Sequence, residues 1–146
     1  SVIETITPLE YLKRHPKNQV AIPSYSSWGY NGYNEVWLEG SNDWIYPHLH
    51  HAGWQLSELA KQENLTPLKK RLLNQAAREL LLAQSSDWAF IMKTGTVAEY
   101  ARKRTKEHLK NYLDLVSSIE NPNVELLRRL EDLNPIFPKI DYRIFA

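Results

Sequence analysis

Residues 66–83 read TPLKKRLLNQAARELLLA, and this stretch decides the fold class. Thr66 followed by Pro67 indicates a helix start, because threonine caps free backbone N–H groups and proline fits the first helical position. Apolar side chains then recur at the spacing of one helix face, at Leu68, Leu72, Ala76 and Leu80. Polar side chains fall off that face, at Lys69, Lys70, Arg78 and Glu79. The stretch predicts an amphipathic helix that ends near Ala83.

Similar start and stop signals recur along the chain. Thr7-Pro8 with Glu10 predicts a short capped helix, and Asn123 caps a last one. Gly95 interrupts the helical pattern and separates two further predicted helices. The predicted helices cover residues 8–15, 42–62, 67–83, 88–92, 97–119 and 124–133. Only residues 20–23 and the terminal residues hint at strand.

We therefore predict an all-α fold, a helical bundle of about four to five helices. The 146 residues suffice for one core and no Gly/Ser linker divides them, so a single domain, 1–146, is expected. Residues 17–41 show no sustained period and are predicted to form a long aromatic loop, ahead of the helices of residues 42–133. Residues 134–146 carry prolines and apolar anchors, which predicts an extended tail over the bundle.

Composition excludes several classes of protein. Cys is absent, which rules out disulfides and thiolate metal sites and leaves no sign of an oxidising compartment. Lys and Arg number 18 against 17 Asp and Glu, a balance that argues against a nucleic-acid binder or a polybasic membrane module. No apolar run approaches the roughly 20 residues of a membrane span, and the N-terminus lacks a signal-peptide pattern. We expect a cytoplasmic protein without nucleic-acid or membrane partners.

Tryptophan is unevenly distributed, with four of the five Trp between residues 28 and 54. The stretch SSWGYNGYNEVWL (26–38) places Trp28 and Trp37 beside short amide and carboxylate side chains. This combination suits sugars, whose apolar faces alternate with hydroxyl groups. Gly29 and Gly32 would let the backbone turn sharply or approach a ligand closely. Clustered aromatic residues also fill cores, so composition alone leaves a sugar-binding surface and plain packing both open.

Metal, nucleophile and phosphate chemistry find little support. His48 and His51 would share a helix face, close to a two-ligand metal arrangement, but surface hydrogen bonding explains them better and no cofactor is predicted. No serine lies in a nucleophile-elbow pattern, so none can be paired with His108. Two short basic runs, 69–71 and 102–104, are interpreted as solvated helix faces because acids are interspersed nearby.

Glycoside chemistry needs two carboxyl groups across one bond. The candidates near the aromatic residues are Glu35, Glu39, Asp43 and Asp87. Three of them fit acids near a helix start, where they favour the helix dipole. Spacing singles out no pair of acid and nucleophile, so we predict no catalytic residue in this chain.

Several longer motifs resemble a known family. They are SSWG (26–29), GY (32–33), VWL (36–38), NDWIY (42–46), NQAARELLLA (74–83), SSDW (85–88), MKTGT (92–96) and IFP (136–138). Together they resemble the C-terminal helical region of glycoside hydrolase family 57, and within it the 1,4-α-glucan branching enzymes. The resemblance spans nearly the whole chain.

The resemblance implies a domain that packs against a distorted (β/α)₇ barrel of the same polypeptide and completes its active-site cleft. The catalytic Glu and Asp of that family lie in the barrel, upstream of this region. By the matching motifs, Trp28 and Trp37 are expected to bind an α-1,4-glucan, with Trp88 and Asp87 facing the same cleft. Residues 1–16 resemble the end of the barrel module, so the chain is expected to be a fragment or excised domain. Trp44 and Trp54 are then expected to pack on the second helix.

Two alternatives stay open at this stage. The chain could be a free-standing carbohydrate-binding or helical interaction module without catalysis. It could also self-associate through an apolar face that the barrel normally covers.

Overall fold

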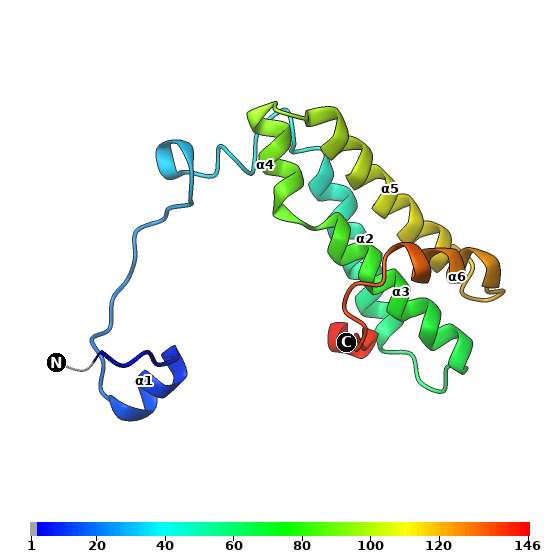
Figure 1. Ribbon diagram of the computed structural model, residues 1–146, viewed down its shortest axis with the longest axis horizontal. Helices are drawn as coiled ribbons and strands as arrows, with labels where there is room; N and C mark the ends of the chain where they lie inside the picture. The colour runs from blue at the N-terminus through cyan, green and yellow to red at the C-terminus, as the bar shows by residue number, and fades with distance from the viewer. Residues whose placement is uncertain (1–2) are drawn as a thin grey trace.

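The computed structural model describes residues 3–146, and the chain forms a helical bundle with an N-terminal arm (Figure 1). Five helices make up the bundle: α2 (Ile45–Ala60), α3 (Pro67–Ala83), α4 (Ser86–Thr94), α5 (Ala98–Ser117) and α6 (Val124–Leu133). Two short 3₁₀ helices flank them, η1 (Tyr30–Gly32) and η2 (Tyr142–Phe145). Residues 3–146 contain no strand, which confirms the predicted all-α class and shows that the strand hint at residues 20–23 was wrong.

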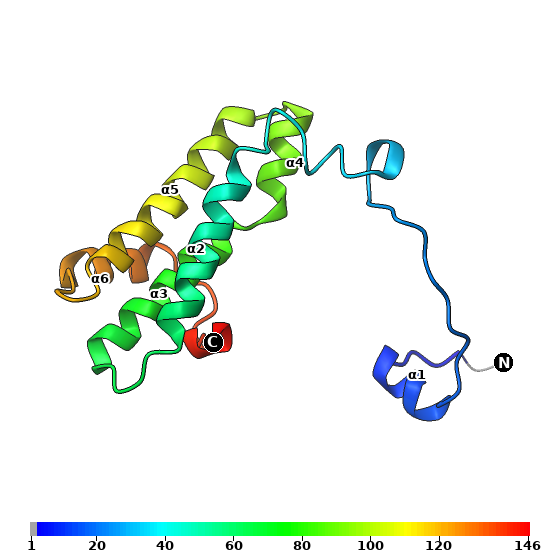
Figure 2. The same ribbon diagram turned by 180° about the vertical axis from the view of Figure 1, so that it is seen from behind.

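Helix α1 (Pro8–Arg14) stands apart from the bundle, at the end of an extended segment (Figures 1 and 2). Its start follows the predicted capping box: the Thr7 hydroxyl accepts from the Glu10 backbone N–H, and the Glu10 carboxylate accepts from the Thr7 N–H. None of its residues is buried, and it exposes Leu9 and Leu12. Local capping therefore defines this helix, without support from the bundle core.

Helix α3 is the centre of the bundle, because α2, α5 and α6 all pack against it. Thr66 caps it as predicted, and Leu72, Ala76 and Leu80 of its apolar face are fully buried, whereas Leu68 is partly buried. Small side chains at Ala76 and Ala77 leave room for close helix packing, and Tyr112 of α5 donates its hydroxyl to the Ala52 carbonyl of α2 (2.8 Å). Burial of the phenol raises the pKa of Tyr112 far above its ordinary value. The domain thus has a core of its own.

Helix α2 begins later than predicted, at Ile45 rather than near residue 42. Residues 39–44 instead form hydrogen-bonded turns, in which Asn42 N–H donates to Glu39 O (2.8 Å) and Asp43 N–H to the same oxygen (2.9 Å). Pro47 lies in the first turn of α2, where its missing N–H has no intrahelical acceptor in any case.

Glu79 was predicted to lie off the buried face of α3, and this was wrong. Its side chain is completely buried. It accepts hydrogen bonds from His108 Nδ1 (2.8 Å), Asn134 Nδ2 (2.8 Å), Gln75 Nε2 (3.0 Å) and Asn111 Nδ2 (3.2 Å). Burial alone would raise the pKa of Glu79, but these donors outweigh it and hold the pKa below its ordinary value. Glu79 therefore joins α3, α5 and the tail through its charge.

The two tryptophans assigned to packing differ. Trp44 packs against the core, with Lys106 Nζ 5.5 Å from the ring centroid. Trp54 does not pack, since 65% of its surface is exposed on α2, and the prediction for it was wrong. Its position in α2 points it away from the buried stripe of Ala52 and Leu56.

The tail, residues 134–146, runs along α3 and ends at η2. Arg78 Nε donates to Ile136 O (2.7 Å), and the Tyr142 N–H donates to Asn74 Oδ1 (2.9 Å). Figure 1 shows the C-terminus lying beside α2 and α3, far from the N-terminal arm. No helix within residues 3–146 is long and apolar enough to cross a membrane.

Candidate functional site

The segment before α2 owes its shape to residues with positive φ. Gly29 has φ +93°, and a Cβ on it would lie 2.5 Å from Val36 Cγ2, so only glycine fits this position. Gly32, with φ +78°, closes a turn in which its N–H donates to Gly29 O (2.8 Å). Asn31 and Asn34 also adopt left-handed backbone conformations, which asparagine tolerates better than most residues. The glycines thus bring Trp28 and Trp37 back toward each other.

A buried asparagine ties this segment to α4. Asn42 is fully buried, and its Nδ2 donates to both Val36 O (2.8 Å) and Ala89 O (3.1 Å). Its Oδ1 accepts from the Glu39 N–H (2.9 Å). The Tyr46 hydroxyl also donates to the Trp37 carbonyl. These bonds hold the backbone around Trp37 against the middle of α4.

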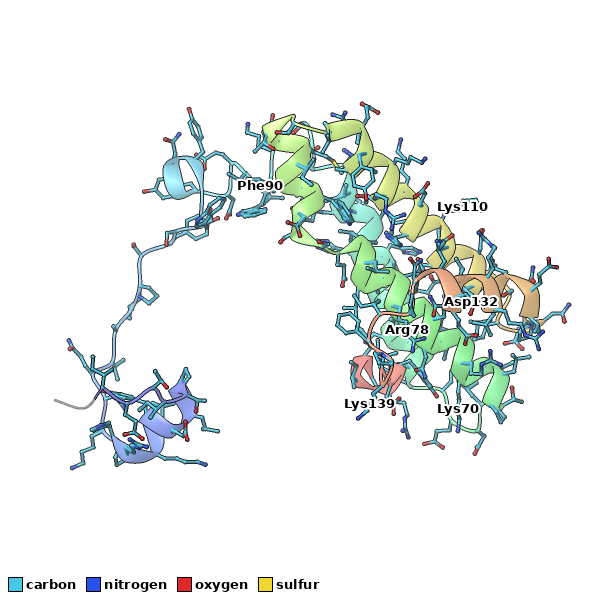
Figure 3. All side chains as sticks on the ribbon, viewed as in Figure 1. Lys70, Arg78, Phe90, Lys110, Asp132 and Lys139 are labelled. Atoms are coloured by element: carbon cyan, nitrogen blue, oxygen red, sulfur yellow. The ribbon has the colours of Figure 1, made fainter. Side chains whose placement is uncertain are left out.

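Three aromatic rings surround a small hollow between this segment and α4. The centroids of Trp28 and Trp37 are 6.2 Å apart, and Phe90 of α4 lies 5.8 Å from Trp28 and 6.3 Å from Trp37. The rings are tilted at 38–49° to one another, so they meet as walls rather than as a stack. Figure 3 labels Phe90 on the side of α4 nearest the N-terminal segment. We call this feature the aromatic hollow; its volume is about 230 Å³ and it is lined by Trp28, Trp37, Ser86, Asp87 and Phe90.

Exposure differs between the two tryptophans. Trp28 is 70% exposed, so one face of its indole is open to a ligand. Trp37 is half-buried and packs partly against the core, which fixes its ring. The pair therefore combines a rigid wall with an accessible platform.

Of the four residues that the sequence singles out, the structure brings three to the aromatic hollow: Trp28, Trp37 and Asp87. Trp88 does not line it. Its indole Nε1–H donates to Leu82 O (2.7 Å), and its ring meets Tyr100 edge-on at 6.0 Å. Its contact with a glucan stays a prediction.

Sequence reasoning missed Phe90 and Ser86. Both lie on one face of α4 with Asp87, since residues three and four apart on a helix are neighbours. The spacing of Ser86, Asp87 and Phe90 indicates that they share a helix face. It does not indicate what this face contacts, because Trp37 precedes Phe90 by more than forty residues. Only the fold shows that this face meets the tryptophans.

The carboxylates of this region have separate surroundings. Asp87 is exposed at the rim and accepts from Ser85 Oγ (3.0 Å). Glu39 accepts from Ser41 Oγ (2.7 Å) and pairs with Lys93 (3.4 Å); the Ser41 hydrogen bond is the main cause that lowers the pKa of Glu39. Glu35 accepts from the Tyr33 N–H (3.0 Å). One carboxylate, Asp87, lines the aromatic hollow, whereas glycoside cleavage uses two.

The histidines do not gather into a ligand set. His48, His50 and His51 are exposed on α2. Within the described residues, no group of three His, Cys, Asp or Glu side chains is placed to hold a metal. His108 lies in the core: Arg104 Nη2 donates to its Nε2 (2.8 Å), so Nδ1 carries the proton that is donated to Glu79. The described residues place no serine in hydrogen-bond contact with His108.

Comparison with known proteins identifies the family of the chain. The profile of a family described as "1,4-alpha-glucan branching enzyme, C-terminal" matches residues 48–145. The chain belongs to this family. The resemblance seen in the sequence motifs is thereby confirmed, and a free-standing module is not favoured.

Two branching enzymes support the same assignment, and an alpha-amylase is also similar to the chain. The 1,4-alpha-glucan branching enzyme of Thermococcus kodakarensis is 30% identical over 148 residues, which cover 94% of this chain and 22% of that protein. The GH57-type branching enzyme of Pyrococcus horikoshii has a TM-score of 0.82 at 31% identity, covering 94% of this chain and 28% of that one. The novel alpha-amylase AmyC of Thermotoga maritima has a TM-score of 0.76 at 41% identity, covering 97% and 26%.

The chain matches only part of each relative. The chain spans about a quarter of the length of the relatives it matches. The family profile matches the chain only from residue 48 onward. It therefore does not include Trp28 and Trp37. The solved relatives, however, cover at least 94% of the chain, and that coverage must include most of the segment before α2.

Proposed function

We propose that this domain binds the glucan chain for a 1,4-α-glucan branching enzyme, with Trp28 and Trp37 as the sugar-contacting residues. The observation that carries this proposal is the aromatic hollow, in which an open Trp28 ring faces a fixed Trp37 ring and Phe90. Indole rings offer flat apolar faces to the C–H faces of glucose. Asp87 and Ser86 at the rim are placed to accept hydrogen bonds from sugar hydroxyls.

The chemistry itself belongs to the rest of the enzyme in this proposal. A (β/α)₇ barrel of the same polypeptide supplies the nucleophilic Glu and the acid/base Asp. The Glu attacks the sugar carbon of an α-1,4 bond to form a glycosyl-enzyme, while the Asp protonates the departing 4-oxygen. The 6-hydroxyl of an acceptor glucan then attacks that carbon, gives its proton to the Asp and releases the Glu, so the α configuration is retained. The domain's residues hold the sugar rings in line and keep water away, which favours transfer over hydrolysis. Trp88 is a further proposed glucan contact on α4, where the bond from its indole N–H to Leu82 O fixes its ring.

The proposal also includes a partner, a product and a compartment. The partner is the catalytic barrel, and the product is a branched glucan of the glycogen or starch type. We place this synthesis in the cytoplasm.

Branching activity of the complete enzyme tests the proposal. Trp28→Ala and Trp37→Ala are each expected to lower branching by about five- to thirtyfold, because each removes one sugar platform whose stacking contributes on the order of 1–2 kcal/mol. Trp54→Ala is the matched control: it removes an equally exposed tryptophan that lies outside the aromatic hollow. Unchanged branching in both hollow variants, with the fold intact, would contradict the proposal.

A second activity, glucan hydrolysis, has one observation in its favour. The relative from Thermotoga maritima shares 41% identity with this chain and is called an alpha-amylase. Product analysis separates the two activities: new α-1,6 branch points indicate transfer, whereas new reducing ends without branch points indicate hydrolysis. A free-standing carbohydrate-binding module is tested by titrating the isolated chain with maltooligosaccharides and following Trp fluorescence. Only this alternative predicts tight saturable binding by the isolated chain.

A further inference from the structure

A second, larger hollow lies between α5, α6 and the start of the tail. It has a volume of about 470 Å³, within the range of small-molecule sites, and shares no lining residue with the aromatic hollow. Its lining residues are Tyr100, Lys103, Arg104, Glu107, Asn111, Arg129, Leu133 and Asn134. We call it the basic hollow.

Cations outnumber acids around it. Lys103, Arg104 and Arg129 line it, against one carboxylate on its wall, Glu107. The buried Glu79 lies next to the basic hollow, since it accepts hydrogen bonds from the lining residues Asn111 and Asn134. When Glu79 is counted as well, the cations still outnumber the carboxylates by three to two. The neighbouring face of α5 carries both signs: Lys106 lies beside Arg102, which pairs with Glu99 (2.5 Å), and Lys110, which pairs with Asp114. The sequence predicts only a solvated face for residues 102–104, because nothing local to them indicates that α6 brings Arg129 opposite.

Arg104 and the two amides of the basic hollow are held in place before any ligand arrives. Arg104 is fixed by Glu107 (3.1 Å) and by His108 (2.8 Å), and each of its two terminal nitrogens keeps a second N–H. Asn111 and Asn134 each donate one N–H to Glu79, so their amides are oriented from below. Arg129 has no ion-pair partner within residues 3–146 and is free to move toward an anion. Such preorganisation lowers the entropic cost of binding.

We infer that the basic hollow binds a phosphorylated sugar, independently of the glucan-binding proposal. Two guanidinium groups match the oxygens of a phosphate with paired N–H donors, and Lys103, which is exposed and only loosely paired with Glu107 (3.7 Å), adds a third charge. The half-exposed ring of Tyr100 and the two amides suit the hydroxyl-bearing sugar part. The size of the basic hollow fits a monosaccharide phosphate.

Isothermal titration of the 146-residue chain tests this inference, with glucose 1-phosphate, inorganic phosphate and glucose as the probes. We expect saturable binding of glucose 1-phosphate that weakens as salt is raised, weaker binding of phosphate, and none of glucose. Arg129→Ala is expected to weaken glucose 1-phosphate binding by at least about tenfold, the loss of one charge-assisted hydrogen bond.

Arg128→Ala is the matched control, because it removes the same charge from the preceding residue of α6, which does not line the basic hollow. Both arginines are exposed, so neither change should alter the circular dichroism spectrum or the melting temperature. Phosphate binding as tight as that of glucose 1-phosphate would overturn the sugar part of the inference. No saturable binding of either anion, or equal losses in the two variants, would overturn the site itself.

Discussion

At the scale of single residues, Gly29 determines where Trp28 lies. Its φ of +93° and the 2.5 Å approach to Val36 leave no space for a side chain. Gly29→Ala is therefore expected to destabilise the chain by about 1–3 kcal/mol and to disturb the Trp28–Trp37 pair. Urea unfolding measures the first effect, and Trp fluorescence measures the second.

Gly53→Ala provides the control for that change. Gly53 lies inside α2, and a Cβ at this position would have nothing within 4 Å, so alanine should stabilise the helix by about 0.5–1 kcal/mol. Equal effects of the two substitutions would contradict the role given to Gly29.

Glu79 gives a prediction on pH. Because its pKa in the folded chain is held below the ordinary value, its stabilising contribution is present above the unfolded pKa of about 4.3 and is lost as pH falls through the folded value. Glu79→Gln should cost about 1–3 kcal/mol at pH 7, because the amide cannot accept all four hydrogen bonds and leaves buried donors unsatisfied. Urea unfolding of both proteins between pH 7 and 3 should show the difference shrinking below about pH 4.3.

The exposed Glu120 serves as the comparison for Glu79. It pairs with Lys69 at the surface (2.8 Å), and Glu120→Gln should change stability by less than about 1 kcal/mol at every pH. A Glu79→Gln difference that stays constant from pH 7 to 3 would show that its charge is not what stabilises the fold.

At the scale of elements, local chemistry explains what the sequence could predict. The starts of α1, α3 and α6 follow the predicted caps, because a cap involves residues only three positions apart. The start of α2 and the burial of Glu79 depend instead on distant partners: Asn42 bonds Ala89, and Glu79 bonds Asn134. Trp28, Trp37 and Asp87 could be selected because they lie in motifs that resemble the family. Phe90 lies in no such motif, and only its contact with the distant Trp28 and Trp37 identifies it.

Helix α1 gives a prediction at this scale. No residue of α1 is buried, and the segment that follows it is exposed through residue 26. Removing residues 1–22 should therefore leave the melting temperature of the bundle unchanged within about 2 °C, as followed by circular dichroism. A fall of more than about 5 °C would mean that α1 supports the bundle.

At the scale of the whole molecule, the exposed aromatic and apolar side chains belong to a domain that spans about a quarter of its relatives' length. Trp28, Trp54 and the apolar residues of α1 are all open in this chain. We expect the isolated chain to self-associate at high concentration through such surfaces. Sedimentation showing a monomer throughout would count against this expectation.

The most direct test of the central claim is a crystal structure of the complete enzyme with a bound maltooligosaccharide. We expect glucose rings against the Trp28 and Trp37 indoles, with sugar hydroxyls within hydrogen-bond distance of Asp87. A glucan bound in the catalytic cleft with both indoles free of sugar contact would contradict the claim.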